Sequence, residues 1–127
     1  MLKQGIEGYV LRISGNQMPS PDRKSSVPKG IQTTLYIYQL TNMNQVIRQG
    51  QSAFYSSIKT KLIAAIETDT NGYFKVALDP GRYSLFTKKD KIFFANIFDK
   101  DNNIAPAEVL SGKMTSVKFV VDYDAVY

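Results

Sequence analysis

The side chains most often used in catalysis are missing from this chain of 127 residues. It contains no histidine and no cysteine. Histidine is the commonest general base and transition-metal ligand, and cysteine supplies thiolate nucleophiles, thiolate metal sites and disulfides. A histidine-based catalytic triad is therefore impossible within the chain. From these absences we expect no enzymatic activity, no metal and no cofactor.

Carboxylates offer the remaining chemistry. Glu67 and Asp69 are the nearest acidic pair, and a glycosidase would need two carboxylates. A turn that follows gives Asp69 a structural explanation, so we do not expect this activity. Asp99 to Asn103 (DKDNN) could supply oxygen ligands to calcium, but Ile104 and Leu110 stand where an EF-hand loop needs glycine and glutamate. We predict a solvated turn there.

Aromatic side chains are the candidates for binding. The chain has 8 tyrosines and 7 phenylalanines but no tryptophan. Exposed aromatic surfaces bind sugars by stacking or bind partner proteins, although tyrosines also favour strands for structural reasons. The candidates for such a surface are Tyr9, Tyr36, Tyr38, Phe54 and Tyr55. Among them we predict Tyr36, Tyr38 and Tyr55 as contact residues for a protein or a polysaccharide, and the lack of tryptophan favours a protein.

The charge of the chain suggests no particular partner. The formal net charge is +5, but the lysines are scattered along the sequence, so we do not expect nucleic acid. No apolar run approaches the roughly 20 residues of a membrane-spanning helix. No signal peptide is visible after Met1, because Lys3, Gln4 and Glu7 interrupt any apolar core there.

The scaffold for these candidates is predicted to be made of strands, with no convincing helix. Leu35 and Ile37 share one face of a strand, and Tyr36 and Tyr38 share the other, which we take as the outer face. Thr41 to Thr60 could contain a short strand near Phe54 to Ile58 or one turn of helix. The seven predicted strands are Gly5 to Ile13, Ile31 to Leu40, Leu62 to Thr68, Tyr73 to Leu78, Arg82 to Lys89, Lys91 to Phe98 and Met114 to Tyr123.

Two tight turns bracket one of these strands. Asn71-Gly72 is a strong hairpin signal, and Asp79-Pro80-Gly81 predicts a second turn. Regularly spaced short strands with such turns predict one all-β domain over residues 1–127, a seven-stranded antiparallel Greek-key β-sandwich. Its inner face is predicted to contain Phe74, Val76, Leu78, Tyr83, Leu85, Phe94, Phe98, Val117, Phe119 and Val121.

Residues 68–85, TDTNGYFKVALDPGRYSL, resemble the carboxypeptidase regulatory-like domains of the prealbumin-like (transthyretin-like) sandwich group. The resemblance covers nearly the whole chain and implies fold more than chemistry. Tyr83 looks like a tyrosine corner, whose hydroxyl pins a strand crossover. The matching positions are Gly8, Val10, Pro28, Gly30, Leu35, Ile37, Thr68, Asp69, Gly72, Phe74, Pro80, Gly81, Tyr83 and Leu85.

The chemistry of related sandwiches does not fit this chain. Transthyretin-like hydroxyisourate hydrolases and intradiol dioxygenases use histidines, which are absent. Pilin and adhesin modules join a first-strand lysine to a last-strand asparagine or aspartate beside an acid. Lys3, Asp122 and Glu67 could be assigned these roles, but Lys3 lies outside the apolar alternation, where a buried amine is not expected.

The leading hypothesis is a non-enzymatic accessory or binding domain that contacts protein or polysaccharide through loops and outer-face tyrosines. The loops are Ser14 to Gly30, Thr41 to Thr60 and Lys100 to Gly112. The resemblance implies an exported or cell-envelope bacterial protein, and hence an extracytoplasmic location. The alternative is a purely structural spacer or assembly module of a larger secreted protein. The sequence leaves the oligomeric state open.

Overall fold

The computed structural model describes residues 4–16, 29–50, 54–89, 91–95 and 97–126. Strands dominate this part of the chain, and the single helical element in it is one 3-10 turn, η1. The predicted all-β class is confirmed. The elements are β1 (Gly5–Asn16), β2 (Lys29–Gly30), β3 (Thr34–Gln39), η1 (Met43–Gln45), β4 (Val46–Arg48), β5 (Phe54–Ile58), β6 (Leu62–Glu67), β7 (Tyr73–Ala77), β8 (Gly81–Lys89), β9 (Ile92–Phe94), β10 (Pro106–Val109) and β11 (Met114–Val126).

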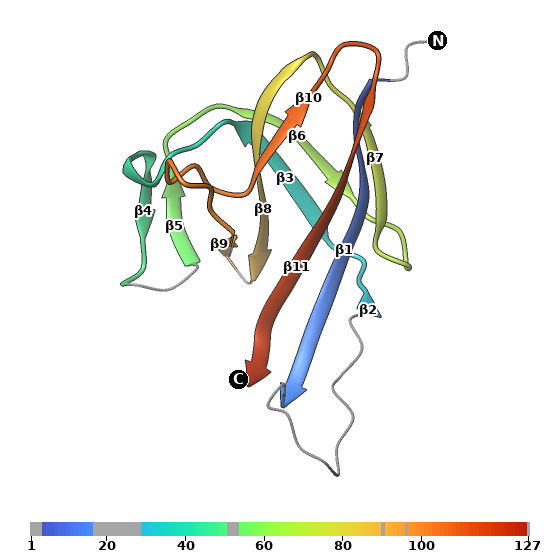
Figure 1. The fold of residues 1–127 in the computed structure, drawn as a ribbon. Helices are drawn as coiled ribbons and strands as arrows, with labels where there is room; N and C mark the ends of the chain where they lie inside the picture. Colours follow the sequence, from blue (N-terminus) through green and yellow to red (C-terminus); the bar gives the residue numbers. More distant parts are fainter. Residues whose placement is uncertain (1–3, 17–28, 51–53, 90, 96, 127) are drawn as a thin grey trace.

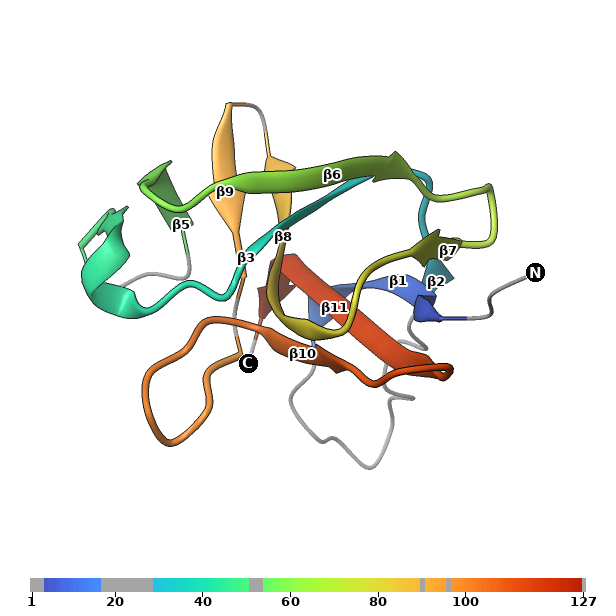
Figure 2. The same ribbon diagram turned by 90° about the horizontal axis from the view of Figure 1, so that it is seen from above.

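The strands form two sheets that face each other. In the smaller sheet β1 pairs with β11, β2 and β7, and the larger sheet has the order β4-β5-β9-β8-β3-β6, with β10 also paired to β8. Figure 2 shows the two layers, with β3 and β6 above β1 and β11. All seven predicted strands correspond to observed ones, and β2, β4 and β10 were missed because each is short.

The first and last strands are parallel, so the prediction of purely antiparallel pairing is wrong at this point. Gly5 lies opposite Met114, and the ladder continues to Asn16 opposite Val126. The two strands run side by side past the rest of the sandwich in Figure 1. Apolar alternation shows which face of a strand is buried, but it carries no information about the direction of the neighbouring strand.

The turn between β6 and β7 is held by the Asp69 side chain. Its Oδ1 atom accepts hydrogen bonds from the amides of Asn71 (2.8 Å) and Tyr73 (3.0 Å), and Gly72 has a φ of 82°. The chain reverses here, but the predicted hairpin is wrong, because β6 pairs with β3 in the larger sheet and β7 with β1 in the smaller one. The Asn-Gly pair specifies only the local reversal.

The chain therefore leaves the larger sheet after β6, adds β7 to the smaller sheet and returns to the larger sheet with β8. After β7 the chain passes Pro80, and β8 starts at Gly81 and pairs with β3 in the larger sheet. The Tyr83 hydroxyl donates a hydrogen bond of 2.6 Å to the carbonyl oxygen of Asp79, across this second turn. Burial raises the pKa of Tyr83, and the nearby Asp79 carboxylate raises it further, so the hydroxyl remains a donor at neutral pH.

The hydroxyl of Tyr83 can be tested separately from its ring. We expect Tyr83→Phe to lower the free energy of unfolding by about 0.5–1.5 kcal/mol, because the partly buried hydrogen bond to the Asp79 carbonyl is lost. Urea unfolding followed by circular dichroism measures the change. An unchanged midpoint would show that water replaces the hydroxyl at no cost.

The core lies between the two sheets and follows the predicted alternation closely. Phe98 is the exception: it was predicted to face inward, but it is exposed. Strand β9 ends at Phe94, so the alternation does not extend to residue 98. The predicted core residues that the structure buries are Phe74, Leu78, Tyr83, Leu85, Phe94, Phe119 and Val121, with Val76 and Val117 partly buried against them.

Segment Thr41 to Thr60 contains both of the elements considered for it. Asn42 caps η1 through its side chain, which accepts a hydrogen bond from the amide of Asn44. Strand β5 covers the residues predicted for a short strand, and β4 pairs with it. This segment forms one end of the larger sheet.

Candidate functional site

Two of the three tyrosines predicted as contact residues are buried. Tyr55 is 0% exposed and Tyr38 is 8% exposed, so the expectation of an exposed surface is wrong for both, while Tyr36 is half-buried. Leu35 and Ile37 do occupy the opposite face of β3, as predicted, and are fully buried. Both faces of this strand are therefore covered.

The face of β3 that carries the tyrosines belongs to a second packed region, which we call the aromatic cluster. It consists of Tyr36, Tyr38, Tyr55, Phe86 and Phe93. Tyr38 lies edge-to-face with Phe86 (5.6 Å between ring centroids) and with Phe93 (5.8 Å), and Tyr55 lies 6.0 Å from Phe86. The rings come from four strands of the larger sheet, so the alternation within β3 alone could not predict the burial of its tyrosines.

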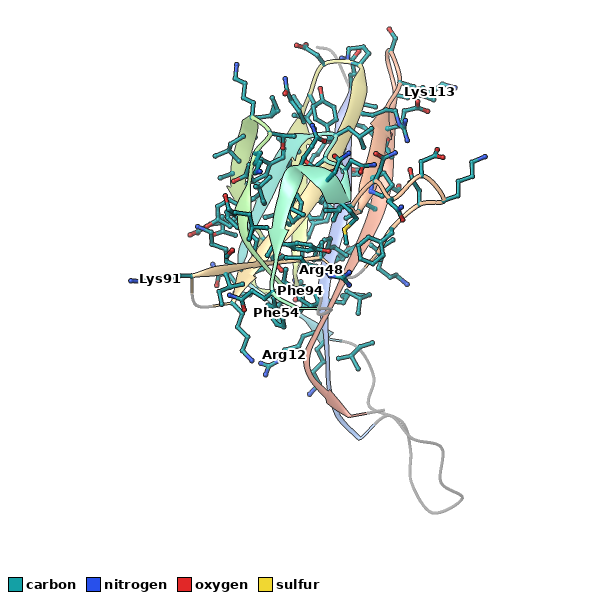
Figure 3. The ribbon with its side chains drawn as sticks, turned by 90° about the vertical axis from the view of Figure 1, so that its left-hand side faces the viewer. Arg12, Arg48, Phe54, Lys91, Phe94 and Lys113 are labelled. Carbon is teal, nitrogen blue, oxygen red and sulfur yellow. The ribbon has the colours of Figure 1, made fainter. Side chains whose placement is uncertain are left out.

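The remaining aromatic candidates are covered to different degrees. The Lys88 ammonium lies 4.9 Å from the Tyr36 ring centroid, and half-buried Phe54 packs against Phe94 at 5.2 Å. Figure 3 shows Phe54 and Phe94 close to each other on one side of the molecule. Tyr9, by contrast, is 47% exposed. Of the five aromatic candidates, it is the one with an open face.

Tyr9 lines a pocket on the outer face of the smaller sheet, together with Tyr73. The two rings are 5.5 Å apart at an angle of 62°. The pocket has a volume of about 440 Å³, and we call it the Tyr9–Tyr73 pocket. Its lining residues are Glu7, Gly8, Tyr9, Tyr73, Ser116, Val117 and Lys118.

Three adjacent strands position the polar side chains of this pocket. Tyr9 of β1 is in register with Tyr73 of β7 and with Lys118 of β11, and Glu7 is in register with Ser116. Residues directly opposite each other on paired strands point to the same face of a sheet. The register thus gathers two rings, a carboxylate, a hydroxyl and an ammonium group.

Gly8 forms the floor of the pocket because β1 and β11 approach each other closely there. A Cβ atom on residue 8 would overlap the carbonyl oxygen of Val117, so a larger residue would push the strands apart. At its other edge β1 pairs with β7, and there Gly8 lies opposite Phe74, whose side chain is buried in the core. The glycine therefore keeps the floor flat.

The electrostatics of the pocket keep the Tyr73 hydroxyl protonated. The Tyr73 hydroxyl donates a hydrogen bond of 3.2 Å to Glu7 Oε2. Desolvation raises the pKa of Tyr73, and the hydrogen bond and charge of Glu7 raise it further. The phenol is therefore neutral at pH 7 and orients the carboxylate. Glu7 can accept hydrogen bonds from a ligand, and Lys118 and Ser116 can donate them.

Sequence reasoning named Tyr9 as a surface aromatic but missed its neighbours. Tyr73 enters the sequence prediction only as the first residue of a strand, and Lys118 only as a position within the last predicted strand. The available signal was the alternation of Tyr73 with buried Phe74, which places Tyr73 outward. The pairing of β1 with both β7 and β11 brings the residues together, and no local pattern predicts that pairing.

The Asp99 to Asn103 segment forms a turn, as predicted. The Asp99 carboxylate accepts hydrogen bonds from the amides of Asp101 and Asn103, both 2.9 Å, and from the Asn103 side chain, also 2.9 Å. The bonds from Asn103 are the main reason why the pKa of Asp99 is lowered. The pattern repeats the Asp69 turn, with amides two and four residues ahead. That this turn binds no calcium stays a prediction.

Several expectations fall on residues outside the described ranges. These are Lys3, the side chain of Asp122 and most of the loop Ser14 to Gly30. The crosslink considered for Lys3 and Asp122 therefore stays an expectation. The part of the chain that the structure describes contains no helix with the length and hydrophobicity of a membrane span.

Comparison of the chain with protein-family models, curated proteins and solved structures gives no match. Function therefore has to be argued from the residues of this chain. The Tyr9–Tyr73 pocket is the exposed feature that combines a hollow shape with aromatic, acidic and basic groups.

Proposed function

We propose that this protein is a non-enzymatic binding domain that holds a sugar unit of a cell-envelope polysaccharide in the Tyr9–Tyr73 pocket. The observation that carries the proposal is the exposed ring of Tyr9, beside the half-buried ring of Tyr73, a carboxylate, a hydroxyl and an ammonium group. Sugars place their C–H faces on aromatic rings and their hydroxyls on polar groups. The lack of tryptophan favours a protein contact on an exposed aromatic surface, but a hollow of about 440 Å³ suits a small ligand such as a sugar unit.

The pocket supports binding rather than bond cleavage. Glu7 is the one carboxylate among its lining residues, and it accepts a hydrogen bond from Tyr73. Glycoside hydrolysis ordinarily needs two carboxylates on either side of the bond. Glu67 and Asp69 do not supply such a pair, since Asp69 is engaged by the turn amides and both residues lie outside the pocket lining.

The finer fold assignment is part of the same proposal. The chain is a Greek-key, prealbumin-like sandwich of the carboxypeptidase regulatory-like kind, and it acts outside the cytoplasm. The Asp69 turn, the Tyr83 hydrogen bond and the crossing of the chain from β6 in the larger sheet to β7 in the smaller one support the fold. Lys91 and Lys113 project on opposite sides of the molecule in Figure 3 and so do not share one basic face of the kind that nucleic acid binds.

The test is binding to soluble peptidoglycan fragments, capsular polysaccharides and mannans, measured by calorimetry. At least one of these is expected to bind, and Tyr9→Ser is expected to weaken it about 5- to 30-fold, because the exposed ring is lost. Lys113→Ser, in a distant exposed turn, is the control and should bind like the parent. A melting curve checks that each variant is folded.

Two results would contradict the proposal: no polysaccharide binds, or Tyr9→Ser binds as tightly as the parent. Changes in amide chemical shifts on addition of the ligand map the site independently, and the largest changes are expected at Glu7, Tyr9 and Tyr73. If the ligand instead changes the amide chemical shifts of the aromatic cluster or of the Asp99 turn, the binding site lies there and not in the Tyr9–Tyr73 pocket.

A structural spacer is the second candidate, and the ribbon of β1 and β11 favours it. These strands stay paired from Gly5 and Met114 to Asn16 and Val126, and they extend beyond the sandwich in Figure 1. A paired ribbon is stiffer than a single strand and suits a connecting element. A spacer would bind none of the polysaccharides, so the same experiment separates the two functions.

A further inference from the structure

Strand β6 presents an open edge at one end of the larger sheet. In the described part of the chain it pairs with β3 and with no other strand. The Thr68 amide donates to the Thr33 carbonyl (2.9 Å), and main-chain groups alternate between the two edges of a strand, so those of Ala65 and Glu67 point to the open edge. An open edge of this kind can pair with another strand.

The side chains along this edge are apolar and exposed. Leu62 is 43% exposed and Ile63 is 39% exposed, although large aliphatic side chains are usually buried. A hollow of about 380 Å³ lies beside the strand. Its lining residues are Gln4, Ile63, Ala64, Ala77, Leu78, Asp79 and Tyr83. A strand added at this edge would therefore find space for its apolar side chains.

The charges around β6 indicate which strand could pair with its open edge. Residues 59–69, KTKLIAAIETD, are symmetric about Ala64 with the charges inverted. If two copies pair antiparallel with Ala64 opposite Ala64, Lys61 lies opposite Glu67 and Lys59 lies opposite Asp69. All four charged residues are exposed. Opposite charges directly across a strand pair stabilise it, and like charges destabilise it.

We propose that two copies of this chain dimerise through antiparallel pairing of their β6 strands, with the two-fold axis at Ala64. The dimer joins the two larger sheets edge to edge. It is independent of the proposed sugar site, because the Tyr9–Tyr73 pocket lies on the outer face of the smaller sheet. Failure of one proposal therefore leaves the other intact.

The lysines of this edge have a defined role in the dimer. Lysines and bulges on an edge strand ordinarily prevent pairing. Lys61 directly precedes β6, and the strand has a register shift opposite Ile37 and Tyr38. Parallel pairing in register would place lysine beside lysine and carboxylate beside carboxylate. An antiparallel register shifted by two residues would pair only Lys59 with Glu67, or only Lys61 with Asp69, and would leave the other charges opposite uncharged residues. The antiparallel register centred on Ala64 is the one that pairs every charge with its opposite. The charges thus favour the register centred on Ala64.

The first test exchanges these charges. Sedimentation up to about 1 mM protein is expected to show a dimer. Lys61→Glu alone and Glu67→Lys alone should each weaken it by about tenfold or more, since each variant places like charges opposite one another twice. A mixture of the two variants should form a heterodimer of parental strength, because the introduced glutamate of one copy then faces the introduced lysine of the other. Both substitutions lie on the surface, so folding is retained.

The second test fixes the register. The chain has no cysteine, so an introduced thiol can form a disulfide only between two copies. Ala64→Cys should crosslink rapidly under mild oxidation, because directly opposite residues of a non-hydrogen-bonded pair are about 4.5 Å apart, within disulfide range. Ala65→Cys is the matched control: it lies one residue away, is more exposed, and faces Ile63 of the other copy.

The outcomes separate clearly. Dimerisation that is lost in the single variants and restored in their mixture, with selective crosslinking at residue 64, supports the proposal. A parent chain that stays monomeric up to about 1 mM overturns it. A dimer whose affinity the charge variants do not change also overturns the proposal, because its interface lies elsewhere. The same holds for a dimer that crosslinks at residue 65 as fast as at residue 64.

Discussion

Replacing Tyr55 by serine is expected to lower the free energy of unfolding by about 3–5 kcal/mol, the usual cost of removing a large buried ring. The Tyr55 side chain is 0% exposed and lies 6.0 Å from the Phe86 ring. Serine cannot fill this volume, so a cavity would open in the aromatic cluster. Urea unfolding followed by far-ultraviolet circular dichroism gives the change directly.

Tyr55→Phe is the matched control for this experiment. The Tyr55 hydroxyl reaches the Ala95 carbonyl at 3.5 Å and Met43 Sδ at 3.7 Å, distances at which hydrogen bonds are weak. Removing the hydroxyl should therefore change the stability by less than about 1 kcal/mol. If serine is tolerated as well as phenylalanine, Tyr55 is not a core residue. If both variants lose stability equally, the hydroxyl and not the ring stabilises the cluster.

The second large effect is expected for Gly72→Val, with a loss of about 2–6 kcal/mol. Two costs combine. A β-branched residue at a φ of 82° is strained by about 1–3 kcal/mol. A Cβ atom at residue 72 would also overlap the Val10 carbonyl oxygen and lie 2.9 Å from Gly30 Cα, which adds about 1–3 kcal/mol of overpacking. Thermal and urea unfolding measure the total.

Gly112→Val separates the two costs. Gly112 has a φ of 72°, similar to that of Gly72, but a Cβ atom there meets nothing within 4 Å. We therefore expect the strain alone, about 1–3 kcal/mol. The difference between the variants measures how tightly the turn packs against β1. Equal losses would show that the turn has room beside Val10, contrary to the structure.

The strands and the main core could be predicted because their signals are local. The alternation of Phe74, Val76 and Leu78 with Lys75 and Ala77 indicates a buried face whatever the strand pairs with. Phe74 and Leu78 are buried and Val76 is partly buried, whereas Lys75 and Ala77 are exposed. Asp69 and Tyr83 act through hydrogen bonds to residues at most four positions away. Such short-range geometry is encoded in a few consecutive residues.

The aromatic cluster and the pocket could not be predicted because each depends on pairing between distant segments. Tyr38 is buried by Phe86 and Phe93, which reach it through β8 and β9. Tyr9 meets Lys118 only because β1 lies beside the last strand. The face of a strand follows from its own residues, whereas its exposure depends on what the rest of the chain places over it.

The parallel ladder of β1 and β11 gives the fold a preferred direction of mechanical strength. Gly5 pairs at one end with Met114 and Asn16 at the other with Val126, so tension that enters at Gly5 and leaves at Val126 acts at opposite ends of the ladder. Such tension slides one strand along the other and loads every hydrogen bond of the ladder together. In a hairpin pulled from its open end, the bonds open one at a time. A load along the chain would thus pass through these two strands while the rest of the sandwich stays unstretched.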